Sequence, residues 1–274
     1  MASSAPSALQ ARTSPALDPD DQDLDDESAI DEAAKMGFLD HLDELRRRLV
    51  VSVAAVFVGF LITFAFIERI FGFIMRPLQA VLPPGGTLIY TEPAEAFLLY
   101  IKIAALAGLL LASPVLLSQI WLFVAPGLYS HEKRYAIPFV VFSTFFFLTG
   151  ALFSHQVVFP LAWRFFAGFS TDYMAFTPKI GPVFSLYTRL LLAFGLIFQL
   201  PTVVFFLAKM GVVTAGLMWR NGKYAILVIF ILAAILTPTP DVVTQSLMAG
   251  PMIVLYGLSI GIAWLFGKRA DENE

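Results

Sequence analysis

Long stretches without Asp, Glu, Lys or Arg recur along most of the chain. A helix needs about 17–25 mostly apolar residues to cross a hydrocarbon core of about 30 Å. Six stretches reach that length: 49–67, 103–131, 135–163, 190–208, 224–240 and 242–267. The pattern therefore predicts an all-α polytopic membrane protein with six transmembrane helices.

Two of these spans carry features that predict their shape. Thr91-Glu-Pro-Ala-Glu95 is expected to start the second span, with Pro93 in the first turn and acids at the positive end of the helix dipole. Pro114 is expected to kink the same span. The fifth span is barely long enough once Thr237-Pro-Thr-Pro-Asp241 is assigned to a turn. We expect either a thinned bilayer there, or tilted helices shielded by partners.

The segments 70–93 and 164–182 connect spans on one side and are rich in turn-forming residues. Prolines and glycines at this density favour defined turns. We therefore predict ordered caps at this side of the bundle rather than long loops.

An amphipathic helix is predicted immediately before the first span. Apolar residues recur there at steps of four and three, and they are Phe38, Leu42, Leu45 and Leu49. Glu44 and Arg48 are four residues apart on the polar side, which favours an ion pair along the helix. Such a helix is expected to lie on the membrane surface and to lead into the first span.

Basic residues near span ends predict the orientation, because they concentrate on the cytoplasmic side. One side has ten, namely Arg46, Arg47, Arg48, Lys133, Arg134, Lys209, Arg220, Lys223, Lys268 and Arg269. The other side has four, namely Arg69, Arg76, Arg164 and Lys179. This bias predicts that both termini and the loop that contains Glu132 are cytoplasmic.

Composition and charge add a division into segments. The chain is 58% hydrophobic and 14% charged, whereas soluble domains are nearer half apolar and a quarter charged. Nine of the 21 acids lie between Asp18 and Glu32, and from Lys35 onward there are 17 Lys and Arg against 12 acids, so the membrane body is net positive although the chain has a net charge of −3. We predict a disordered acidic cytoplasmic tail at 1–35, a membrane domain at 36–268 and a short cytoplasmic tail at 269–274.

The sequence argues against enzyme chemistry. It has no cysteine and only three histidines, so neither disulfides nor a structural metal are expected. It has no phosphate-binding Gly-x-x-x-x-Gly-Lys-Ser/Thr loop, no His-Glu-x-x-His and no Gly-x-Ser-x-Gly. No span holds two Asp residues that could form an intramembrane protease. We therefore expect no catalytic residues and no cofactor.

Two carboxylates stand out on the predicted cytoplasmic side. Glu44 belongs to the amphipathic segment, and Glu132 is followed by Lys133 and Arg134 between two apolar spans. One interpretation is that each forms a weak surface ion pair with its basic neighbours. The other is that both form an acidic patch for incoming arginines, because lysine cannot reproduce the bidentate guanidinium–carboxylate contact.

Several polar or aromatic residues in or near the spans are candidates for specific contacts. Gln199 lies near the middle of the fourth span. It predicts either an interhelical hydrogen bond, worth about 0.6–2 kcal/mol, or a contact for a substrate or partner helix. Gln119, and Gln245 with Asp241, are candidates for buried polar contacts.

Three other side chains have simpler expectations. His155 is expected to bond a neighbour rather than to relay protons. Trp121 and Phe123 are predicted to be membrane-interface aromatics, and an aromatic beside Glu132 could also pack against a bound peptide.

Four motifs, in order along the six predicted spans, resemble the TatC family. They are His41-Leu-Asp-Glu-Leu-Arg-Arg-Arg-Leu49, Pro114 with Gln119-Ile-Trp121, Phe123-Val-Ala-Pro-Gly-Leu-Tyr-Ser-His-Glu-Lys-Arg134, and Leu236-Thr-Pro-Thr-Pro-Asp-Val-Val-Thr-Gln245. The resemblance covers about residues 36–268. TatC is the multispanning receptor of the twin-arginine protein translocase, and the fold implied is a concave, cupped-hand bundle of six helices.

The resemblance implies a receptor in the bacterial cytoplasmic (inner) membrane that binds twin-arginine signal peptides of folded precursors. It implies the single-span partners TatA and TatB, a multimer of TatB–TatC units, contact with membrane lipid, no nucleic acid, and export driven by the proton-motive force. The alternative is a secondary transporter or channel for a small solute. That class predicts paired ionisable groups near the midplane or an inverted repeat, and the sequence shows neither.

The resemblance also implies roles for individual residues. The carboxylates at Glu44 and Glu132 would receive the signal's arginines. The full set assigned to signal-peptide binding is Glu44, Glu132, Arg46, Phe123 and His131, and the set assigned structural or functional roles is Pro77, Pro114, Gln119, Asp241 and Gln245. Many members carry Glu where this chain has Gln199, so a hydrogen-bonding role is retained there, but a charged one is not expected.

Overall fold

The computed structural model describes the backbone of residues 19–82, 86–124, 136–171, 173, 176–237 and 241–267. It describes the side chains in these ranges from residue 41 onward, apart from Val124 and Ala136. Two compact units are distinguished, Met1–Arg47 and Arg48–Glu274, and each is described by itself. The described residues form helices joined by turns, with an isolated β-bridge between Ile89 and Lys179, which confirms the all-α class.

The first helix, α1 (Pro19–Ala65), includes the boundary between the two units. The helix predicted at 36–49 is part of it. It begins inside the acidic segment for which composition predicts disorder. The division of the chain at residues 35 and 268 stays a prediction.

Within the described residues, five helical segments are long and apolar enough to cross a membrane. They are His41–Ala65, Glu95–Phe123, Ile137–Ala167, Ile180–Lys209 and Val242–Phe266. The fifth predicted span corresponds to α9 (Gly222–Leu236), which has 15 residues. At 1.5 Å per residue it is about 22 Å long, shorter than a hydrocarbon core of about 30 Å. The shortness expected of this span is confirmed, and the orientation of the termini stays a prediction.

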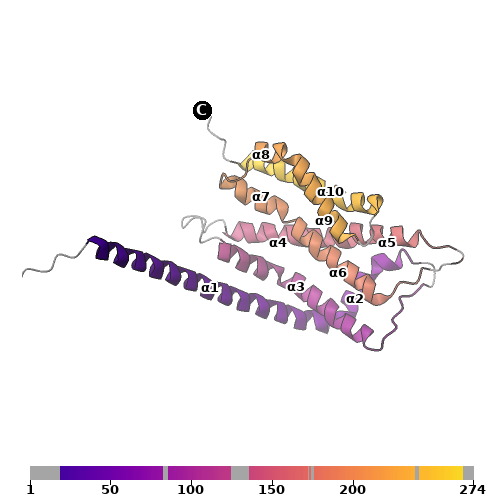
Figure 1. Cartoon of the computed structure of the whole chain (residues 1–274). Helices are drawn as coiled ribbons and strands as arrows, with labels where there is room; N and C mark the ends of the chain where they lie inside the picture. Colours follow the sequence, from indigo (N-terminus) through magenta and orange to yellow (C-terminus); the bar gives the residue numbers. More distant parts are fainter. Residues whose placement is uncertain are drawn as a thin grey trace, which may run out of the picture. The chain divides into compact units, whose positions relative to one another are not determined.

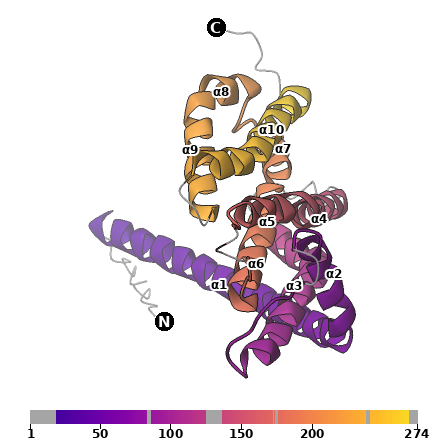
Figure 2. The ribbon, with the colours of Figure 1, turned by 90° about the vertical axis from the view of Figure 1, so that its right-hand side faces the viewer.

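The second unit contains all elements after α1. In chain order they are α2 (Ile67–Gln79), α3 (Glu95–Val124), α4 (Ala136–Phe153), the π-helix η3 (Ser154–Val158), α5 (Phe159–Ala167), α6 (Ile180–Ile197), α7 (Leu200–Lys209), α8 (Ala215–Arg220), α9 and α10 (Val242–Phe266). Within this unit α3 packs on α4 and α6, α4 packs on α6, and α10 packs on α7 and α9 (Figure 1). Figure 2 shows α4 and α5 nearly in line, with η3 between them.

The larger core cluster is built around α6. Leu190, Phe194 and Val183 of α6 are fully buried, as are Ile103 of α3 and Phe159 of α5. Since lipid tails are as apolar as these side chains, packing fit rather than water exclusion has to hold such a bundle together. The helices must therefore interdigitate closely.

Two glycines let the backbones of α1 and α3 approach closely where the helices cross. A Cβ added at Gly59 would lie 2.5 Å from the carbonyl oxygen of Gly108, and one added at Gly108 would lie 2.5 Å from the nitrogen of Phe60. One turn further, the Thr63 hydroxyl donates to the Ala104 carbonyl oxygen at 2.7 Å. Small residues and an interhelical hydroxyl bond are typical of tight transmembrane helix pairs.

The described parts of the connections after α2 and after α5 meet at one end of the unit, through residues 89 and 178–180; we call it the capped end. Ile89 and Lys179 form a parallel bridge, in which the Ile89 amide donates to the Pro178 carbonyl (3.3 Å) and the Ile180 amide donates to the Ile89 carbonyl (3.0 Å). The prediction of ordered caps is confirmed. However, α3 begins at Glu95, so Pro93 precedes the helix, and its predicted position in the first turn is wrong.

Candidate functional site

His131 and Glu132 fall between α3 and α4, and three aromatic rings hold these two helices and α7 together near this connection. The ring centroids of Trp121 (α3) and Phe139 (α4) are 4.2 Å apart, and Phe206 (α7) lies 4.3 Å from each. We call these three residues the aromatic anchor. Trp121 is only 8% exposed. Its prediction as a membrane-interface residue is wrong, because α4 and α7 enclose the ring.

Two further predicted residues lie on the same end of α3. The Gln119 side-chain oxygen accepts a hydrogen bond from Nη1 of Arg48 on α1 at 3.3 Å, and its amide donates to the Ser118 hydroxyl at 3.4 Å. The predicted polar contact of Gln119 is therefore confirmed. Phe123 is half-buried in the last turn of α3. The sequence did not indicate Arg48 as a partner for Gln119, because 71 residues separate the two.

The structure does not test whether Glu44 and Glu132, the two carboxylates of the proposed acidic patch, lie close together. Glu132 and His131 fall within 125–135, outside the described residues. Glu44 and Arg46 belong to α1 in the first unit, where Glu44 is half-buried and Arg46 is exposed. The pairing of Glu44 with Glu132 stays a prediction.

Gln199 lies between α6 and α7, at the N-cap position of α7. Its side-chain amide donates to the backbone carbonyl of Ser143 on α4 at 2.7 Å. The interhelical hydrogen bond, one of the two interpretations of this residue, is thus present. It links the break between α6 and α7 to the middle of α4.

Asp241 and Gln245 hold the turn between α9 and α10. The Asp241 carboxylate accepts from the Thr244 amide at 2.7 Å and caps α10. The Gln245 amide donates to the Phe230 carbonyl of α9 at 2.8 Å. Both predicted polar contacts are confirmed. Pro77 and Pro114 lie inside α2 and α3, respectively.

His155 lies in η3 and is buried. Its Nδ1 is 3.2 Å from the Tyr187 hydroxyl, and its ring stacks on Phe73 with centroids 4.4 Å apart. The expectation that a neighbour satisfies this histidine is confirmed. A π-helical turn commonly marks a functional position, and nothing in the sequence indicated one here.

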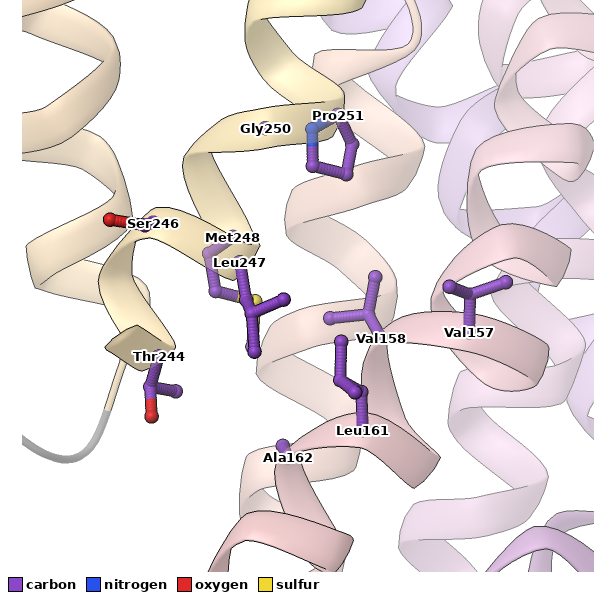
Figure 3. A pocket seen from close by; sticks show the side chains of 10 residues that line it. All are labelled: Val157, Val158, Leu161, Ala162, Thr244, Ser246, Leu247, Met248, Gly250 and Pro251. Atoms are coloured by element: carbon purple, nitrogen blue, oxygen red, sulfur yellow. The ribbon is translucent and has the colours of Figure 1, made fainter. Parts of the chain in front are cut away.

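A cavity of about 300 Å³ lies between the first half of α10 and the η3–α5 segment (Figure 3). Its lining is aliphatic, with Leu161 and Leu247 among its members, and the hydroxyl-bearing Thr244 and Ser246 also contribute. None of the predicted site residues lines it. Among the described residues, no group of His, Cys, Asp and Glu could hold a metal ion.

Comparison with known proteins decides the family. The sequence profile of the family described as Sec-independent protein translocase protein (TatC) matches residues 40–251. The chain belongs to the TatC family. Two similar relatives are the Sec-independent protein translocase proteins TatC of Desulforapulum autotrophicum and Koribacter versatilis. The first is 46% identical and covers 89% of this chain and 90% of its own length, and the second is 43% identical and covers 87% and 91%.

A solved structure supports the same assignment. The crystal structure of the twin-arginine translocase receptor TatC is 39% identical and has a TM-score of 0.71 over 81% of this chain and 97% of its own. Membership in the family confirms a multi-pass protein of the bacterial inner membrane that takes part in protein transport and is not an enzyme. The alternative of a small-solute transporter is set aside.

Proposed function

We propose that this chain is the subunit that binds twin-arginine signal peptides, and that Glu44 and Glu132 receive the two guanidinium groups. The observation that carries the proposal is the aromatic anchor. Trp121 and Phe139 flank the loop that contains Glu132, and their contact at 4.2 Å fixes both ends of that loop. A loop with fixed ends has less freedom to lose when it binds a peptide, so its affinity is higher.

The chemistry of the two carboxylates supports discrimination between arginine and lysine. A hydrogen bond to a charged group is worth about 1.5–3 kcal/mol, and the planar guanidinium matches a carboxylate with two parallel bonds. A lysine ammonium makes a single-point contact and does not reproduce this fork. Phe123, half-buried at the end of α3, offers an aromatic surface beside the loop, and Arg46 and His131 complete the proposed groove.

Partners are proposed from the family and from the exposed faces of the short helix. Membership implies a translocase complex, and we propose TatA and TatB as its single-span subunits, with TatB–TatC units forming a multimer. Leu227, Ile231 and Ile235 of α9 are exposed and recur every four residues, a stripe suited to a partner helix or lipid. We propose that the proton-motive force drives export, as the family resemblance implies. The membrane potential contributes about 2.3 kcal/mol per charge per 100 mV, and the lack of a nucleotide-binding loop agrees with this drive.

An export assay tests the proposal. The chain replaces the resident TatC of a bacterium together with its own TatA and TatB, and export of a folded reporter is measured. We expect export with a twin-arginine signal, none with twin lysines, and loss in Glu132→Gln. Glu68→Gln, an exposed acid on α2, serves as the control with the same charge change. Equal export of both signals would refute the proposal.

A further inference from the structure

Glu95 is the first residue of α3, and its carboxylate joins the starts of two helices. Oε2 accepts from the Thr91 amide at 3.1 Å, just before α3. Oε1 accepts from the amide of Gly181, the second residue of α6, also at 3.1 Å. One side chain therefore connects segments 86 residues apart at the capped end.

Electrostatics favours this arrangement. The first amides of a helix have no partner within the helix, and the N-terminus carries a partial positive charge. The N-cap residue of α6, Lys179, makes no side-chain capping bond. Glu95 supplies the missing acceptor from another helix, and its charge lies at the positive ends of both α3 and α6.

Gly181 fits the carboxylate closely. A Cβ added at Gly181 would lie 2.7 Å from Oε1 of Glu95, so any larger residue would displace the carboxylate. The Ile89–Lys179 bridge lies directly beside this contact. In the first turns of the same two helices, Ile180 and Val183 of α6 and Leu99 of α3 are buried in the core cluster. We call the two Glu95 hydrogen bonds the clasp.

The clasp lies at the opposite end of α3 from Phe123. α3 has 30 residues and is therefore about 45 Å long. Glu95 begins it, while Gln119, Trp121 and Phe123 lie near its other end. α3 and α6 also pack on each other, and the clasp adds a polar contact between their first turns to this packing.

We propose that Glu95 is a positioning residue whose clasp couples α3 to α6, and that transport depends on it while signal-peptide binding does not. The inference rests on the proposed function. Glu95→Gln removes the charge and replaces one carboxylate oxygen with an NH2 group. This group cannot accept a hydrogen bond from a backbone N–H, so at least one of the two bonds is lost. Glu92→Gln makes the same charge change on an exposed residue of the same segment and is the matched control.

The test compares binding and export in the full chain with its partners. We expect Glu95→Gln to keep peptide affinity within about twofold. The export rate should fall about fivefold, because losing one hydrogen bond costs about 1 kcal/mol and this free energy corresponds to a factor of about five. Glu92→Gln should change neither. Unchanged export in Glu95→Gln would overturn the proposal, and so would an equal fall in peptide affinity, which indicates general misfolding.

A rescue experiment tests whether Glu95 acts by holding the two connecting segments together or through a general effect on the structure. The chain has no cysteine, so Ile89→Cys with Lys179→Cys introduces a single pair at the bridge. In the Glu95→Gln background, oxidation should restore export to that of the oxidised pair with Glu95, and reduction should remove it. Failure of the disulfide to restore export would overturn the proposal.

The rate of disulfide formation reports on the clasp without any function assay. It should fall in Glu95→Gln relative to Glu95 and Glu92→Gln, because the segments then spend less time together. An unchanged rate would overturn the clasp itself. Lack of peptide binding by the wild-type chain would instead refute the proposed function, so the two failures are distinguishable.

Discussion

Gln199 is a polar side chain within a predicted span, and the structure identifies its hydrogen-bond partner. Its amide donates to the Ser143 carbonyl at 2.7 Å, at the point where α6 gives way to α7. In the bilayer no water can replace that contact, although the measured value of such bonds is modest. The bond therefore ties a helix break to its neighbour at a small but definite gain in stability.

Gln199→Leu should lower the free energy of unfolding by about 0.6–2 kcal/mol, measured by thermal unfolding in detergent. Peptide affinity should stay within about twofold, since a lost interhelical bond of this size leaves the fold intact. Gln199→Met, which keeps the volume, controls for packing and should show the same loss. Reduced peptide binding at unchanged stability would favour the other interpretation, a substrate contact.

Residue identity predicted some contacts and missed others for a physical reason. Asp241 and Gln245 could be predicted, because a short carboxylate before a helix caps it and an amide in a span needs a partner. Trp121 was assigned wrongly because its environment is made by Phe139 and Phe206, which come from two other helices. Only the packing of α3, α4 and α7 reveals that the ring is enclosed.

The start of α10 is an element-scale feature that depends on one side chain. Asp241→Ala removes the acceptor for the Thr244 amide and should cost about 0.5–2 kcal/mol. Asp241→Asn keeps an acceptor oxygen and should cost much less. Chemical denaturation in mixed micelles of the two variants measures the difference. An equal loss in both would show that the charge, rather than the cap, stabilises the helix.

Helix positions followed from the sequence more reliably than helix details. The shortness of α9 followed from the proline-rich turn that ends it. The true start of α3 did not, because the Glu95 amide closes a turn on the Glu92 carbonyl before the helix begins. The π-turn η3 was also invisible, since it surrounds His155, whose contacts with Tyr187 and Phe73 are tertiary.

At the scale of the whole molecule, substitutions at the crossing of α1 and α3 test whether the bundle requires these helices to pack closely. Gly59→Ala places a Cβ 2.5 Å from a backbone oxygen of Gly108. The helices must separate, so we expect a loss of about 1–3 kcal/mol, measured as a lower thermal midpoint. Gly257→Ala on α10 meets no atom within 4 Å and should gain about 0.5–1 kcal/mol. Equal effects of the two would show that the crossing is not tight.

The architecture followed from the sequence because long apolar runs without charged residues typically form transmembrane helices. Glu44 and Glu132 followed from the charge pattern as candidates for binding arginine, and the roles of the other site residues followed from family resemblance, which matched short motifs along the chain. The clasp and the aromatic anchor did not follow, since each joins segments that are distant in sequence. Glu95 in particular read as an acid at the start of its own helix, and only the fold brings Gly181 to it.

The central claim is that carboxylates at the loop between α3 and α4 read arginine in a signal peptide. The most direct test measures binding of a twin-arginine peptide and its twin-lysine counterpart to the purified chain and to Glu132→Gln. We predict that affinity falls about tenfold or more on either change, and that combining them costs little further. Equal affinity in all four combinations would contradict the account.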